Sequence, residues 1–171
     1  MVITVADEGN KRKGEMSKEE QAQCVSDILF WFRRNKTPVQ DSSTSEDLQP
    51  LAKALGGKLA SLLEILLMES KNIVFYEDKR GMNAEEIIDA YQTINIEGVV
   101  PFAVDLDGND YLVIGVDGEV KEWNEDDGLE EDEVHASFEG YVEEYRNNLL
   151  ASKFEYVEDC GCMAKASKAR K

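Results

Sequence analysis

Three apolar strands separated by two Asp-Gly pairs, residues 99–123, constrain the fold of this chain most. The segment reads VVPFAVDLDGNDYLVIGVDGEVKEW, with Asp107-Gly108 in the first break and Asp117-Gly118 in the second. Asp-Gly suits the positive φ angles that two-residue β-hairpin turns demand. Val, Ile, Tyr and Phe between the turns fill a half-buried pleated surface. The segment therefore predicts a meander at the centre of a sheet.

Helical signals precede this meander. Ser17 and Glu20 form the Ser-x-x-Glu capping box that begins a helix, and Thr37-Pro38 ends it. Residues 59–68 are apolar on nearly every side, which is typical of a helix buried between layers. The N-terminal part of the chain is therefore expected to be helical.

The remaining elements alternate between strand and helix. Residues 72–76 read as a strand, and Asn83 with Glu86 caps a helix inserted before the meander. Apolar residues at helical spacing predict a helix over 134–151, and alternation predicts a short strand at 154–157. The order predicts an α+β fold: a mainly antiparallel β-sheet with a central meander, packed against N-terminal, inserted and C-terminal helices.

The length of 171 residues, 42% of them hydrophobic, suits one domain with one core. Residues 1–16 are polar and without periodicity, so we expect a disordered arm. Residues 17–158 are expected to form the single domain. Residues 159–171 are small, polar and basic, and predict a flexible tail.

The charge balance favours some partners and disfavours others. Lys and Arg total 19 against 36 Asp and Glu, a formal net charge of −17. Such a surface keeps a protein soluble, repels nucleic acid and anionic membranes, and favours basic partners or cations. Direct nucleic-acid binding and membrane binding are therefore not expected.

Cysteine usage and hydropathy bear on the compartment. The three cysteines have no framework spacing, which indicates a reducing compartment rather than a disulfide scaffold. The first 15 residues hold no apolar run long enough for a signal peptide. Residues 59–68 have about half the length that a bilayer crossing needs and include Glu64. The cytoplasm or the nucleus is therefore the expected location.

Residues that could carry chemistry are few, and no catalytic residue is predicted. The single histidine, His135, has no nucleophile or orienting partner in a recognisable pattern, and it is expected at the start of the last helix. Cys160 and Cys162 could bind a soft metal or form a strained disulfide. A closed zinc site would need Cys24 and His135 as well, so two thiols in a flexible tail are expected and no cofactor is predicted.

Two acidic segments could bind calcium. Asp105-x-Asp107-x-Asn109 resembles the opening of a calcium loop, but the sixth and twelfth positions are Asp110 and Val116 rather than Gly and Glu, so a hairpin turn is expected. The later acidic segment, residues 122–133, could collect calcium weakly without a preformed cage. Calcium binding there is the alternative function, and no metal ligand is assigned.

This later segment, which we name the acidic loop, is the predicted partner-binding site. Aromatic anchors dominate protein interfaces, and charges steer approach and register. A hydrophobic anchor rimmed by carboxylates would bind a basic protein, but the tryptophan could equally be core and the carboxylates merely solvated. The predicted site residues are Glu122, Trp123, Glu125, Asp126, Asp127, Glu130, Glu131 and Asp132.

Residues 55–157 resemble the SUKH superfamily of fungal cell-wall-synthesis regulators and bacterial toxin-immunity proteins. Residues 59–68 and 73–76 are similar to the apolar helix and first strand of that family. Residues 100–112 resemble its central strand–turn–strand. The segment Gly118-Glu-Val-Lys-Glu-Trp-Asn124 resembles its Gly-x-Val-x-x-Trp-Asp strand, and Ser137-Phe138 begins a segment similar to its closing helix.

The resemblance implies a binding module without enzymatic activity. Bacterial members of the superfamily neutralise toxins, and fungal members act as regulators and scaffolds. The superfamily has no shared catalytic residues, so none is carried over to this chain. The expected function is therefore protein–protein interaction, in an immunity or a regulatory role, with a basic protein partner.

Overall fold

The computed structural model describes residues 16–39, 43–70, 73–76 and 79–166 of the chain. Its helices are α2 (Lys18–Arg34), α3 (Ser45–Ala54), α4 (Ser61–Glu69), α5 (Ala84–Ile94) and α6 (Phe138–Leu150). Its strands are β1 (Val74–Phe75), β2 (Lys79–Gly81), β3 (Val100–Val104), β4 (Asp110–Ile114), β5 (Val120–Asn124), β6 (Gly128–Leu129), β7 (Phe154–Val157) and β8 (Cys162–Lys165). The predicted α+β fold is confirmed, and most of the predicted arm lies outside the described residues.

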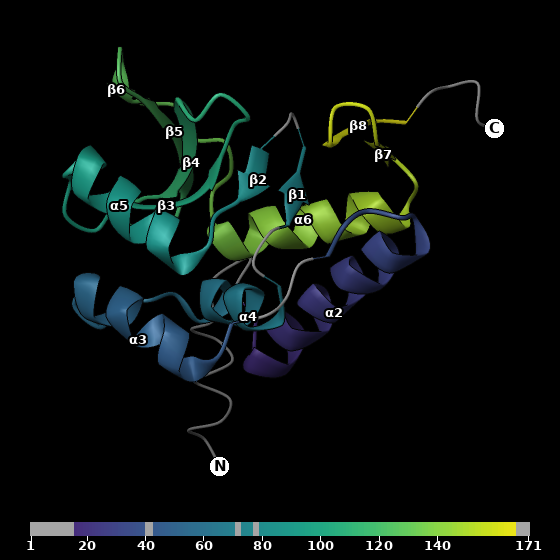
Figure 1. Ribbon diagram of the computed structural model, residues 1–171, viewed down its shortest axis with the longest axis horizontal. Helices are drawn as coiled ribbons and strands as arrows, with labels where there is room; N and C mark the ends of the chain where they lie inside the picture. Colours follow the sequence, from purple (N-terminus) through teal and green to yellow (C-terminus); the bar gives the residue numbers. More distant parts are fainter. Residues whose placement is uncertain (1–15, 40–42, 71–72, 77–78, 167–171) are drawn as a thin grey trace, which may run out of the picture.

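The strands form two antiparallel units. Six of them make one sheet in the order β1-β2-β3-β4-β5-β6, and β7 pairs with β8 in a separate hairpin. An isolated parallel bridge joins Tyr76, just after β1, to Met163 in β8. The hairpin therefore lies beside the β1 edge of the sheet, as Figure 1 shows.

Local sequence signals explain where the helices begin. The side chain of Ser17 accepts the N–H of Glu20, and the Glu20 carboxylate accepts the N–H of Ser17. Asn83 and Glu86 make the same reciprocal pair at the start of α5. Each pair satisfies backbone donors that the first turn of a helix leaves unpaired. Both predicted caps are confirmed.

The central meander is confirmed as β3, β4 and β5, but its turns are longer than two residues. The backbone N–H of Asp105 still donates to the carbonyl of Asp110 across the first turn. The N–H of Gly115 donates to the carbonyl of Glu119 across the second. Only the glycine of each Asp-Gly pair has a positive φ, +79° at Gly108 and +86° at Gly118. A two-residue type I′ turn needs positive φ at two successive positions, whereas these longer turns need it at one.

Helices cover both faces of the sheet. α6 crosses one face with α2 packed against it, and α4 lies against α2 (Figure 1). The main hydrophobic core fills this side and extends from Cys24 in α2 to Met163 in β8. A smaller core of Ile94, Val99, Val113 and Trp123 lies where α5 meets the sheet.

The predicted flexible tail is wrong for the described part of residues 159–171. Residues 162–165 form β8, and Met163 in this strand is only 1% exposed. The sequence shows too few apolar residues there to predict a strand, but β7 supplies a hydrogen-bonding edge from Phe154 to Val157. The domain that was expected to end at residue 158 therefore continues through β8.

None of the helices in the described parts of the chain combines the length and the apolar composition needed for a bilayer crossing.

Candidate functional site

The acidic loop, which its charge repulsion alone would predict to be a solvated loop, is a hydrogen-bonded hairpin. Its residues Gly128–Leu129 form β6, which pairs with Trp123 and Asn124 of β5. Asp127 donates its backbone N–H to the Asn124 side chain at 2.8 Å, and Glu130 donates its N–H to the Glu122 carbonyl at 2.9 Å. Backbone pairing of this kind outweighs the mutual repulsion of the carboxylates.

The hairpin displays most of its carboxylates to solvent. Glu122 and Glu130 are half-buried, and no described residue forms an ion pair with any carboxylate of the loop. A rim of negative charge held on a hydrogen-bonded hairpin can attract a basic surface. The exposed carboxylates belong to Glu125, Asp126, Asp127, Glu131, Asp132 and Glu133.

Trp123 is not the exposed anchor that one reading of the sequence predicts. It is 8% exposed and packs against its cross-strand partner Tyr111, with the ring centroids 5.8 Å apart. Adjacent residues of a strand point to opposite faces of the sheet. Glu122 and Trp123 therefore separate: the tryptophan enters the smaller core, and Glu122 faces the α6 side.

A groove of about 1160 Å³ lies on this α6 side. Tyr141, Tyr145 and Asn148 of α6 form one wall. The β7–β8 hairpin forms another. The sheet side is lined by Tyr76 just after β1, Lys79 of β2, Leu112 of β4 and Glu122 of β5. Because Glu122 and Val134 both line the groove, the acidic loop between them adjoins it.

Aromatic rings make up much of the groove wall. Tyr76 and Phe154 are stacked, with centroids 4.8 Å apart and an interplanar angle of 21°. Tyr145 lies 5.8 Å from Phe154, donates its hydroxyl to the Val74 carbonyl, and has its pKa raised well above 10.0 by burial. The phenol is therefore neutral, and the wall it forms is mainly apolar.

Charged side chains of both signs line the same groove. The basic ones are Lys79, Lys153 and Lys165, and the acidic ones are Glu122, Glu144 and Glu155. Lys79 is only 9% exposed, and its side chain has no hydrogen bond or ion pair with the residues that the structure describes. The ammonium nitrogen itself reaches solvent in the groove, because Thr37 Oγ1 is the only buried side-chain nitrogen or oxygen without a hydrogen-bond partner among the described residues.

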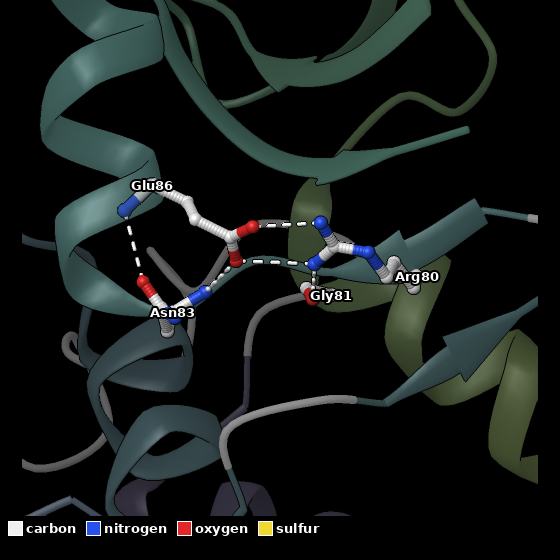
Figure 2. A network of polar contacts seen from close by, with 4 residues as sticks. All are labelled: Arg80, Gly81, Asn83 and Glu86. Carbon is white, nitrogen blue, oxygen red and sulfur yellow. Dashed lines mark hydrogen bonds and ion pairs between the residues drawn. The ribbon is translucent and has the colours of Figure 1, made fainter. Parts of the chain in front are cut away.

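The neighbouring residue of β2 explains how Lys79 is placed. Arg80 makes a bidentate ion pair with Glu86 of α5, at 3.0 and 2.6 Å, as Figure 2 shows. The same carboxylate accepts the N–H of Asn83 at 2.9 Å. This hydrogen-bonded ion pair lowers the pKa of Glu86 and raises that of Arg80. Since Arg80 points to α5, alternation along β2 directs Lys79 to the opposite, groove side.

His135 lies before α6 rather than in its first turn, because the helix expected from residue 134 begins at Phe138, and His135 instead forms an isolated antiparallel bridge with Val120 of β5. Its Nδ1 accepts the backbone N–H of Ser137 at 3.3 Å, and its Nε2 lies 3.7 Å from a Glu144 carboxylate oxygen. Its ring also packs against Gly140, where an added Cβ would lie 2.5 Å from the imidazole. These contacts anchor the connection between the acidic loop and α6.

The cysteines do not form the zinc site considered from the sequence. Cys160 and Cys162 are joined to each other by a disulfide, with their Cα atoms 5.3 Å apart, which replaces the two free thiols expected there. Cys24 is buried, and burial raises the pKa of its thiol to about 11. Among the described residues, no three His, Cys, Asp or Glu side chains are grouped so that they could hold a metal.

Asp105 likewise belongs to a turn, as the hairpin interpretation predicts. Its carboxylate accepts the backbone N–H groups of Asn109 at 2.9 Å and of Asp110 at 3.2 Å. The acidic loop also has no grouped carboxylates within the described chain, so calcium would find no preformed cage there.

The groove as a whole could not be found from the sequence. Its lining residues run from Trp31 to Ala166 and come from elements that no local pattern places together. The side of the sheet to which Glu122 points could be predicted, because side chains alternate along the Gly118–Asn124 segment and Glu122 therefore faces away from Trp123. Comparisons with protein-family models and with curated proteins find no match to this chain.

Proposed function

We propose that this chain is a non-enzymatic protein-interaction module of the SUKH type, which binds a basic protein through the acidic loop and the adjoining groove. The observation that carries the proposal is the position of Glu122 in the wall of an aromatic groove, immediately beside the exposed carboxylates of the loop. Apolar contact area and steering charge are thus continuous on one surface.

The groove takes the place of Trp123 as the apolar part of the interface. Interfaces gain most of their affinity from aromatic and apolar contacts that exclude water, while rim charges set the rate of approach and the register. Phe154, Tyr156 and Tyr76 supply such contacts along the groove. Glu125, Asp126 and Asp127 supply the rim charge.

The resemblance of residues 55–157 to SUKH proteins supports the same proposal, because those proteins act by binding other proteins. The net charge of −17 supports a basic partner over an acidic one. Both an immunity role and a regulatory role fit this mode of binding.

The test begins with affinity capture from the lysate of the native host, followed by binding measurements with the purified partner. The loop variant carries Glu125→Gln, Asp126→Asn, Asp127→Asn, Glu131→Gln and Asp132→Asn. A matched control changes the same number of exposed carboxylates away from the loop: Glu64, Glu69, Glu85, Asp89 and Glu97. Both variants change the net charge equally.

We expect the loop variant to bind at least about tenfold more weakly than the control, roughly 1.4 kcal/mol. Binding of the unaltered chain should weaken as salt rises, because exposed charges are screened. Glu122→Gln should weaken binding several-fold, whereas Glu97→Gln should not. Equal affinity of the loop variant and its control would exclude the acidic loop as the interface.

A further inference from the structure

The turn of the β7–β8 hairpin contains a disulfide between residues only two apart. Cys160 is exposed, whereas Cys162, the first residue of β8, is 6% exposed. Gly161 between them has a φ of +67°, a conformation that glycine adopts readily and that reverses the chain at this point. The two cysteines are therefore brought together by the turn itself.

A disulfide in this position adds little to the fold. The entropy that a crosslink removes from the unfolded chain grows with the length of the loop it closes, and this loop is very short. The hairpin is held by other contacts: four cross-strand pairs join β7 and β8, and Met163 is buried in the main core. Breaking the bond should therefore leave the hairpin in place.

Access to the two sulfur atoms is unequal. Cys160 lies at the surface, where a small thiol can reach it, and Cys162 is almost fully buried at the start of β8. The third cysteine, Cys24, is fully buried in α2 and packs in the core with α6, so it has no route to the pair. Thiol exchange in this chain is thus confined to one exposed disulfide, and exposed disulfides are the readily exchanged ones.

We propose that Cys160 and Cys162 form a reversible thiol–disulfide site that exchanges with low-molecular-weight thiols of the glutathione class. The thiolate of one small thiol attacks the Cys160 sulfur, the Cys160–Cys162 bond breaks, and Cys162 leaves as a thiolate that takes a proton from water. A second small thiolate attacks the small-molecule sulfur of the mixed disulfide and releases Cys160, which is then protonated. Two small thiols become one small disulfide, and the protein pair gains two electrons and two protons.

The disulfide lies beside one wall of the groove, so its reduction would change the chain next to that wall. Cys162 pairs with Val157, and the neighbouring pair Tyr156–Met163 places Tyr156 in the groove wall. Oxidation fixes the turn that ends this ladder, and reduction releases the turn alone. The exchange is thus a covalent modification close to the proposed binding surface, although it does not depend on that function.

The experiment equilibrates the full chain with mixtures of reduced and oxidised glutathione, quenches with acid, alkylates and measures the mass. We expect an oxidised form that lacks the two alkyl groups carried by the reduced form, and an oxidised-to-reduced ratio that falls with the square of the reduced glutathione concentration. Cys160 and Cys162 should become alkylated together under native conditions, while Cys24 stays unlabelled. Cys24→Ala should keep the whole transition.

Single variants test the order of attack. Cys162→Ser should accumulate a mixed disulfide with one glutathione at the exposed Cys160, and Cys160→Ser should form it at least tenfold more slowly. In methyl NMR spectra the Met163 signal should shift on reduction while that of Met82, buried elsewhere in the core, stays in place. Three thiols that stay free at every glutathione ratio, a disulfide-linked dimer, or a bond reducible only after unfolding would each overturn the proposal.

Discussion

Two adjacent residues of β2 show how alternation assigns opposite roles to similar side chains. Arg80 is fully engaged with Glu86, whereas Lys79 enters the groove without a partner among the described residues. The stem of this lysine is buried, but its ammonium group reaches solvent in the groove. The ammonium group would donate to a carbonyl or carboxylate oxygen of a segment bound in the groove.

Replacing this lysine should separate stability from binding. Lys79→Met keeps the apolar stem and removes a charge that reaches solvent, so we expect the free energy of unfolding to stay within about 0.5 kcal/mol of that of the unaltered chain. Affinity for the partner should fall, because the bound segment loses its donor. Urea unfolding and calorimetric titration measure the two effects, and Lys58→Met, at an exposed position outside the groove lining, is the control. A less stable variant with unchanged affinity would contradict a binding role for Lys79.

Among the secondary-structure elements, the link between β2 and α5 fixes the sheet side of the groove. The Arg80–Glu86 pair joins the strand to the first turn of the helix (Figure 2). The two side chains are 36% and 34% exposed, so the pair is partly screened by solvent. Its contribution to stability at neutral pH should be roughly 0.5–1 kcal/mol.

This link predicts a pH dependence. The pKa of Glu86 is lowered in the folded state from its ordinary value of 4.5, so the unfolded chain binds the proton more tightly. The stabilisation is complete above the unfolded pKa and is lost as the pH falls through the folded one. Unfolding curves between about pH 6 and pH 3 should therefore lose stability more steeply for the unaltered chain than for Arg80→Met. Parallel curves for the two proteins would show that the pair contributes nothing.

Over the whole molecule, the excess of carboxylates opposes folding. The chain of 171 residues has a net charge of −17, and its carboxylates repel one another more strongly in the compact state than in the unfolded one. The exposed carboxylates of the acidic loop add to this repulsion and have no described ion-pair partners. Keeping them despite the cost is consistent with a role in binding.

Screening should reveal this cost. Raising sodium chloride from about 20 to 200 mM shortens the Debye length from about 20 to 7 Å, so we expect the free energy of unfolding to increase. The loop variant with five neutralised carboxylates should start more stable and respond less to salt. Thermal or urea unfolding at each salt concentration measures both effects. A stability that does not change with salt would mean that the carboxylates are already well separated in the fold.

The sequence by itself determined the local elements of this protein. Two capping boxes predict where helices begin, because each satisfies backbone groups within a few residues of itself. They are formed by Ser17 with Glu20 and by Asn83 with Glu86. The alternation in residues 99–123 predicts the meander for the same reason, since strand pairing across short turns is a local property. These signals were enough to predict the α+β fold.

Only the tertiary structure decided which faces are covered and where the groove lies. α5 buries Trp123 while α6 and the β7–β8 hairpin leave the Glu122 side hollow, and no local pattern distinguishes the two faces in advance. β8 is a strand because β7 offers it an edge and the core accepts Met163. Each of these outcomes depends on packing between residues far apart in the chain, where burial and register are settled jointly.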